Sequence, residues 1–446
     1  MSLEHELFEA LGEITVIDTH THLVGGALGA RGLHDVLLYH MAVSDLYAAG
    51  CPSGARLTEF PGWPSREEAS LRIEEALPFL PLVENTSTSW AIRIILRDLY
   101  EWHEPLTAGN WRRLDDSIQE RSTDRAWQRD LLRRMRVRKI GTEWARREQG
   151  QDDDIFDYAL EWAFFTRCQW GEYDTPLYEL ERCWEKSPEA PSPIGSGKRP
   201  EVKRSIASLD DIHEALASYV AHLTKIRLLS TATHLSTDLD YRVPTDVQMA
   251  AALTRRATAG PDERNIYAAY VHEHFLSALE KHAPHITFQF SLGAEPLPHE
   301  TGSRIAQHTI AQLGDMISRH PGLKFQCFLS SRHANQSLCT MCRELPNFSL
   351  TGFWWHNFFP GAIRQVFEER LDMLPTNKHI GFFSDAYCLE WSYAKLVLVR
   401  RCMAEVFAQK IRMGHYDREM ALRVARAILY DTPQTLLGFT PSPTLA

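Results

Sequence analysis

The stretch Val16-Ile17-Asp18-Thr19-His20-Thr21-His22-Leu23 passes from apolar residues into a His-x-His pair. In a strand, residues two positions apart project from the same face, so His20 and His22 can both face one ion. Neutral imidazole binds zinc, manganese or iron, so the pattern predicts a site for one divalent metal ion and does not by itself choose among the three metals. Zinc is the cofactor that we expect. Two histidines that are simply solvated or packed in a core are the alternative, which their position at the end of an apolar strand disfavours.

The rest of the chain alternates short apolar runs with long amphipathic segments, a pattern that predicts βα units. Parallel strands that are covered by helices should be apolar along most of their length. Eight runs fit this description: 14–18, 136–142, 162–168, 225–231, 286–291, 323–329, 348–354 and 379–385. Eight such units favour an α/β fold of the closed (β/α)8 type, the TIM barrel.

The last predicted strand ends in the carboxylate of Asp385. Because strand eight lies beside strand one in a closed barrel, Asp385 should lie next to His20 and His22. Two imidazoles and one carboxylate would leave coordination positions open for substrate and water. The alternative is that Asp385 only caps the helix that follows it.

We expect a single barrel domain over 1–446, with two segments that depart from the simple repeat. The segment from about 31 to 130 lacks a convincing strand and predicts a helical insertion after strand one. The segment 187–205 is rich in Ser, Pro and Gly and predicts a flexible surface loop. Amphipathic patterns at 394–411 and 417–429 predict C-terminal helices that complete the barrel.

The composition limits the classes of partner. The 446 residues include 58 acidic and 48 basic side chains, for a formal net charge of −10, and the two signs are mixed along the chain. Without a basic stripe, nucleic acid is not expected as a partner. The first residues carry no signal-peptide pattern, and no run approaches the roughly 20 apolar residues of a membrane helix. We therefore expect a cytoplasmic protein with no membrane partner.

Eight cysteines are too few for a disulfide scaffold in a chain of this length, so we expect reduced thiols. Cys339 and Cys342 form a C-x-x-C pair, but no second such pair accompanies it. Because a structural zinc site would need further ligands, we expect both cysteines to pack on a helix.

The finer pattern resembles the uronate isomerases (glucuronate isomerases) of the amidohydrolase superfamily. The similarity runs from Thr15 to about Phe439. Besides the two strand ends, it is carried by Tyr39-His40 leading to Ala48-Ala49-Gly50, by 137–142, by Phe353-Trp354-Trp355-His356-Asn357, and by Arg400-Arg401. This resemblance implies a (β/α)8 barrel with one divalent metal that interconverts an aldehyde uronate and its keto isomer by proton transfer between C2 and C1.

The resemblance also implies roles for individual residues. Asp385 would act as the base in addition to its metal role, and metal-bound water or His40 would assist proton transfer. Arg167, at the end of predicted strand three, could pair with a substrate carboxylate, since a guanidinium fits a carboxylate bidentately. A surface ion pair is the alternative for Arg167. Trp354 and Trp355 could form the wall of a sugar pocket, or could simply pack near the barrel rim.

Three positions depart from the family pattern. Met41 stands where the family has a tyrosine after the histidine, and Ser291 stands where it has a histidine on strand five. Tyr387 stands where an arginine binds the sugar acid, so Tyr387 is expected to contact the substrate in its place. The substrate of this chain is therefore expected to be an altered sugar acid.

Two rival functions stay open. A metal-dependent hydrolase of the same superfamily could act on a small acid, ester or lactone, but predicted strands five and six do not end in the histidines that such hydrolases usually add. The second rival function is that of a metal-binding relative that has lost catalysis and serves as a binding or structural protein. The expected partner is a small sugar acid, and a homo-oligomer is compatible with the sequence.

Overall fold

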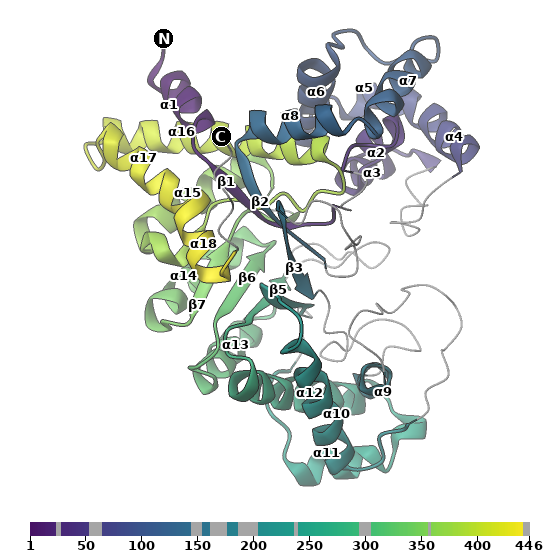
Figure 1. Cartoon of the computed structure of the whole chain (residues 1–446), viewed down its shortest axis with the longest axis vertical. Helices are drawn as coiled ribbons and strands as arrows, with labels where there is room; N and C mark the ends of the chain where they lie inside the picture. Colours follow the sequence, from purple (N-terminus) through teal and green to yellow (C-terminus); the bar gives the residue numbers. More distant parts are fainter. Residues whose placement is uncertain are drawn as a thin grey trace.

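The structure is a computed structural model, and it describes residues 1–23, 28–52, 65–143, 154–160, 176–185, 204–235, 240–293, 305–355 and 358–439. At its centre is one curled sheet of eight parallel strands that follow one another in sequence order, with helices outside it (Figure 1). The strands are β1 (Val16–Thr21), β2 (Val137–Glu143), β3 (Phe156–Leu160), β4 (Ser230–His234), β5 (Thr287–Leu292), β6 (Phe325–Leu329), β7 (Phe348–Thr351) and β8 (His379–Ile380). The fold is the predicted α/β (β/α)8 barrel.

The chain that follows β8 returns to β1. The backbone N–H of Asp385 donates to the carbonyl of His20 at 2.9 Å, and the N–H of His22 donates to the carbonyl of Ala386 at 2.9 Å. These two bonds join the last strand segment to the first, so the carboxyl ends of β1 and β8 are neighbours.

The strands are largely buried and closely packed, as expected for parallel strands with helices on their outer face. β1 and β5 are buried at every position. In β2, a Cβ atom on Gly141 would lie 2.5 Å from the carbonyl oxygen of Thr19, so only glycine allows β1 and β2 to approach this closely.

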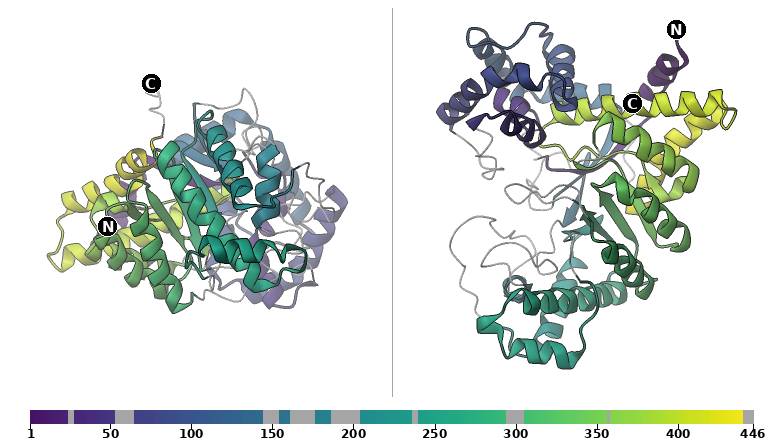
Figure 2. Two further views of the ribbon diagram at one scale, coloured as in Figure 1. Left: turned by 90° about the horizontal axis from the view of Figure 1, so that it is seen from below. Right: turned by 180° about the vertical axis from the view of Figure 1, so that it is seen from behind.

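The first helix, α1 (Leu3–Gly12), precedes β1. The described residues between β1 and β2 form helices: α2 (Leu33–Leu37), α3 (His40–Ala48), α4 (Arg66–Ala76), the 3-10 helix η2 (Leu77–Phe79), α5 (Leu80–Val83), α6 (Ser87–Tyr100), α7 (Trp111–Ser122) and α8 (Arg125–Met135). They gather at one end of the molecule (Figures 1 and 2). That this helical segment is an insertion into the barrel stays a prediction.

The later helices alternate with the strands. They are α9 (Pro176–Glu185), α10 (Leu209–Leu223), α11 (Asp246–Leu253), η5 (Arg256–Thr258), α12 (Pro261–His282), α13 (Gln307–Arg319), η6 (Arg332–Ala334), α14 (Asn335–Glu344), α15 (Pro360–Met373), η8 (Thr376–Lys378), α16 (Leu389–Arg412), α17 (Arg418–Arg426), the π-helical turn η9 (Ala427–Asp431) and α18 (Thr432–Leu437). Helices α9 to α12 lie at the end opposite α2 to α8 (Figures 1 and 2). Among the helices of the described ranges, none is long and apolar enough to cross a bilayer.

Two strand predictions need correction. The predicted strand at 162–168 lies outside the described residues, and β3 is at Phe156–Leu160 instead. β3 carries the buried Asp157, whose carboxylate pairs with Lys139 of β2 at 3.3 Å, so a search for uninterrupted apolar runs misses it. β4 begins at Ser230, and the predicted run 225–231 therefore overlaps it by only two residues.

The predictions for the C-x-x-C pair and for the C-terminal helices are confirmed. Cys339 and Cys342 are buried thiols on α14, which confirms that they pack on a helix. The predicted C-terminal helices at 394–411 and 417–429 correspond to α16 and α17. Most of the predicted loop at 187–205 lies outside the described residues.

Candidate metal centre

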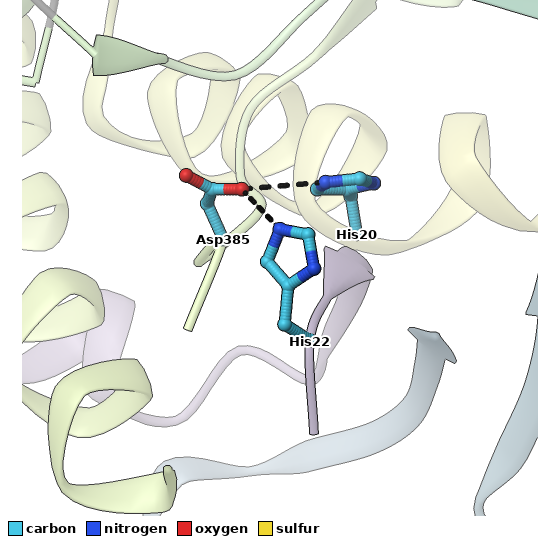
Figure 3. A group of neighbouring side chains, drawn as sticks. All are labelled: His20, His22 and Asp385. Atoms are coloured by element: carbon cyan, nitrogen blue, oxygen red, sulfur yellow. Dashed lines mark hydrogen bonds and ion pairs between the residues drawn. The ribbon is translucent and has the colours of Figure 1, made fainter. Parts of the chain in front are cut away.

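Two imidazoles and one carboxylate meet at the carboxyl ends of β1 and β8. His20 Nε2 lies 3.3 Å and His22 Nε2 lies 3.1 Å from the same oxygen, Oδ1 of Asp385 (Figure 3). One ligand atom from each of the three residues lies within 4.8 Å of the others, and all three residues are buried. This is the only group of three or more such side chains with metal-binding spacing in the part of the chain that the structure describes.

The backbone at Asp385 adopts an unusual conformation. Its φ is 54°, in the left-handed region that side chains other than glycine rarely occupy. Such strain costs of order 1–3 kcal/mol and tends to collect at functional sites. The conformation directs the carboxylate of Asp385 toward the two histidines (Figure 3).

The carboxylate of Asp385 is strongly held in its ionised form. Burial opposes ionisation, but the hydrogen bonds from His20 and His22 outweigh it and hold the pKa of Asp385 well below its usual value. Both bonds end at Oδ1, and no hydrogen bond from the described residues reaches Oδ2.

Glu143, the last residue of β2, forms a hydrogen bond with the proposed metal ligand His22. Its Oε1 accepts a hydrogen bond from Nδ1 of His22. Burial lowers the pKa of His22, but the carboxylates of Glu143 and Asp385 outweigh burial and raise it above its usual value. A histidine whose Nδ1 is held by a carboxylate keeps Nε2 directed at a metal, as is usual for metal-binding histidines. Glu143 was missed because the predicted strand ended one residue earlier.

Aromatic rings enclose the two histidines. The ring of Tyr387 stacks on His22, with centroids 4.3 Å apart and planes 12° apart. The ring of His20 lies 4.8 Å from Phe328 of β6 and 5.6 Å from Phe383. The structure therefore places Tyr387 against a proposed metal ligand.

His40 begins α3 and lies in the same aromatic cluster. Its ring stacks on Trp355 at 4.8 Å and lies 6.1 Å from Tyr387. Burial lowers the pKa of His40 to about 3, so the imidazole is neutral at physiological pH. A neutral imidazole can accept one proton while it donates another.

The remaining predicted residues have mixed outcomes. Trp354 is buried, and its ring lies 5.7 Å from His234. Arg167 lies outside the described residues. His234, at the end of β4, bonds through Nδ1 to Ser291 of β5 at 2.6 Å. It was missed because the predicted strand ended at residue 231.

The residues present fit a single divalent ion. Imidazole nitrogens and one carboxylate are a donor set that zinc, manganese and iron accept. The three side chains already converge, and Glu143 fixes one of them. The identity of the ion does not follow from this donor set.

Comparison with solved structures gives matches over nearly the whole chain. The chain is similar to a uronate isomerase from Bacillus halodurans, with TM-score 0.71 and 17% identity, covering 98% of this chain and 96% of that one. It is similar to a glucuronate isomerase from Caulobacter crescentus, with TM-score 0.77 and 14% identity, covering 99% and 95%. A metal-dependent hydrolase candidate from Lactobacillus casei gives TM-score 0.59 and 13% identity, covering 97% of both chains.

At these identities the likeness shows the (β/α)8 fold. No protein-family model matches the sequence, and no curated protein matches it.

Proposed function

We propose that this chain is a metal-dependent isomerase that interconverts an aldehyde uronate and its keto form. The observation that carries the proposal is the convergence of His20, His22 and Asp385 at the carboxyl end of the barrel, where enzymes of this fold place their active sites. The similarity in fold to two uronate or glucuronate isomerases supports the choice of reaction.

His20, His22 and Asp385 would hold the ion. A bound divalent ion would polarise the substrate carbonyl and so make the proton on C2 more acidic. This matters because a carboxylate is by itself a weak base.

The proton transfers can then be assigned to this chain's own groups. Asp385, through Oδ2, takes the proton from C2 and returns it to C1. His40, which burial keeps neutral, accepts the proton of the C2 hydroxyl while it donates one to the C1 oxygen. The C2 hydroxyl thus becomes the carbonyl, and no other reactant is needed.

The substrate would be a sugar acid that differs from the common uronates. Trp354 and Trp355 form an aromatic wall beside His234 and His40, a surface suited to the C–H face of a sugar. Arg167 is the proposed partner of the substrate carboxylate. Tyr387 would contact the substrate as well as His22.

The cytoplasm as the compartment, and a homo-oligomer as the assembly, stay predictions.

Hydrolysis of a small acid, ester or lactone is the second candidate, supported by the similarity in fold to the hydrolase candidate. Against it, β6 contributes Phe328 beside His20 in place of a histidine that could bind a second metal or activate water.

The deciding experiment is a screen of the purified chain, reconstituted separately with zinc, manganese and iron, against hexuronates and aldonolactones. Formation of a keto acid from a hexuronate is expected, and Asp385→Asn should abolish it. Lactone hydrolysis without isomerisation would replace the proposal with the second candidate.

A further inference from the structure

A buried lysine lies behind the metal site, in a position that the proposed reaction does not use. Lys395 projects from α16 and is 2% exposed. Its Nζ donates to the carbonyl of Ser384 at 2.6 Å and to the hydroxyl of Tyr39 at 2.8 Å. Burying an ammonium group costs free energy unless hydrogen bonds or an opposite charge compensate for the lost hydration.

Tyr39 links Lys395 to the proposed metal ligand Asp385 through hydrogen bonds. The hydroxyl of Tyr39 donates its proton to the backbone carbonyl of Asp385 at 2.7 Å, so it can only accept from Lys395. The ring of Tyr39 is buried and stacks on Trp391 of α16, with centroids 4.3 Å apart. Lys395 and Tyr39 therefore donate hydrogen bonds to two successive backbone carbonyls, those of Ser384 and Asp385.

These carbonyls belong to the strained turn. Asp385 has a φ of 54°, a left-handed conformation that aspartate adopts more readily than most residues but still uncommonly, and surrounding contacts stabilise it. The N–H of Ser384 donates to the buried carboxylate of Asp18 at 2.7 Å. The turn is thus held through its carbonyls by Lys395 and Tyr39 and through its N–H by Asp18.

We propose that Lys395 and Tyr39 are positioning residues for the metal ligand Asp385. They keep the turn at Ser384–Asp385 in the conformation that directs the carboxylate toward His20 and His22. Because Tyr39 immediately precedes His40, the same contacts also fix the start of α3 and the ring of His40. This inference rests on the metal site within the proposed function.

The test measures zinc affinity of the full-length metal-free protein by competition with a chromogenic chelator, alongside thermal unfolding. Lys395→Met keeps the length of the side chain and removes the donors. We expect it to weaken zinc binding at least about tenfold, the usual effect of losing a group that orients a metal ligand. Tyr39→Phe, a milder change, should weaken binding in the same direction.

The control is a second buried lysine on the same helix. Lys410 is 3% exposed and bonds the carboxylate of Asp372 at 2.7 Å, away from the metal ligands. Lys410→Met should lower the thermal midpoint but leave zinc affinity unchanged. The double variant Lys395→Met with Tyr39→Phe should bind zinc more weakly than Lys395→Met alone, because Lys395 holds the carbonyl of Ser384 and Tyr39 holds that of Asp385.

Folded Lys395→Met protein with wild-type zinc affinity would overturn the inference. If Lys395→Met does not fold, Tyr39→Phe decides in the same way. A wild-type chain that binds zinc but converts no uronate would reject the proposed reaction and leave this inference standing, whereas a wild-type chain that binds none of zinc, manganese and iron would overturn both.

Discussion

The carboxylate of Glu143 contacts a proposed metal ligand directly, through Nδ1 of His22. Glu143→Gln keeps the size of the side chain but removes its charge and can present an N–H to the imidazole in place of an oxygen. We expect zinc affinity to fall about 10- to 100-fold, because such partners orient the ligand and fix its tautomer. Chelator competition measures the change.

A matched control uses another glutamate that bonds a histidine. Glu280 accepts from Nδ1 of His320 at 3.1 Å, in the α12–α13 region remote from the ligand set. Glu280→Gln should leave zinc affinity unchanged. Equal zinc affinities for Glu143→Gln and the wild type would show that other contacts orient His22.

Tyr387 stacks on His22 and carries no positive charge. D-glucuronate and D-galacturonate should therefore be turned over poorly by the wild-type chain. Tyr387→Arg combined with Met41→Tyr should improve kcat/KM roughly 10- to 100-fold, the value of one charge-assisted hydrogen bond of about 1.5–3 kcal/mol. Steady-state assays of both uronates measure the effect.

Tyr387→Met, combined with the same Met41→Tyr, removes the ring without adding a charge and should give no gain. Wild-type turnover near or above about 10 s⁻¹, the level of a dedicated enzyme, would show that Tyr387 and Met41 do not limit uronate conversion.

At the scale of elements, α12 and the end of α13 are joined by a charged cluster. Glu273 accepts two hydrogen bonds from Arg319, each 2.9 Å long, and pairs with His320 at 3.3 Å. Burial opposes ionisation of Glu273, but the bonds from His320 and Arg319 outweigh it and lower its pKa to about 2. Burial lowers the pKa of His320, but its hydrogen bonds and ion pairs with Glu273 and Glu280 outweigh burial and raise it above 6.5.

The pH dependence follows from these directions. The lowered pKa of Glu273 means that its contribution to stability is complete above about 4.5 and is lost as the pH falls through about 2. The raised pKa of His320 means that its contribution is complete below 6.5 and is lost as the pH rises through its folded-state value. Both contributions are therefore present near pH 5.5.

We expect Glu273→Gln to lower the free energy of unfolding most near pH 5.5, by about 1 kcal/mol after allowance for solvent screening. The loss in free energy of unfolding should be smaller at pH 3, because Glu273 begins to be protonated. At pH 9 His320 is neutral, so only the loss of the ion pair with Arg319 should remain. Urea unfolding at the three pH values measures it. Glu419→Gln, which removes an exposed pair with Arg423, should show no such profile, and a pH-independent loss for Glu273→Gln would contradict the assignment.

The elements also explain what the sequence could predict. The His-x-His pair and Asp385 were found because each ends an apolar run, and the barrel topology then places them together. β3 was misplaced because a buried ion pair, Asp157 with Lys139, interrupts its apolar pattern. Glu143 and His234 were missed because the polar carboxyl end of a barrel strand has the composition of a loop, so local pattern ends the strand too early.

At the scale of the whole molecule, a metal that binds only the folded chain should stabilise it. At free zinc of 100 times the dissociation constant, the added stability is about 2.7 kcal/mol. We expect zinc to raise the thermal midpoint and a chelator to reverse the rise. His22→Ala should fold yet show no zinc-dependent rise, and a rise of equal size in that variant would place the stabilising ion elsewhere.

The contact between the first and last strands has a consequence for biosynthesis. Asp385 follows His22 by 363 residues, and its backbone N–H donates to the carbonyl of His20 in β1. While the ribosome is still adding the intervening residues, β1 therefore carries two histidines without their carboxylate, and its edge has no neighbour on that side. The nascent chain has to protect an open strand edge until late in translation, and tight metal capture can begin only after Asp385 has emerged.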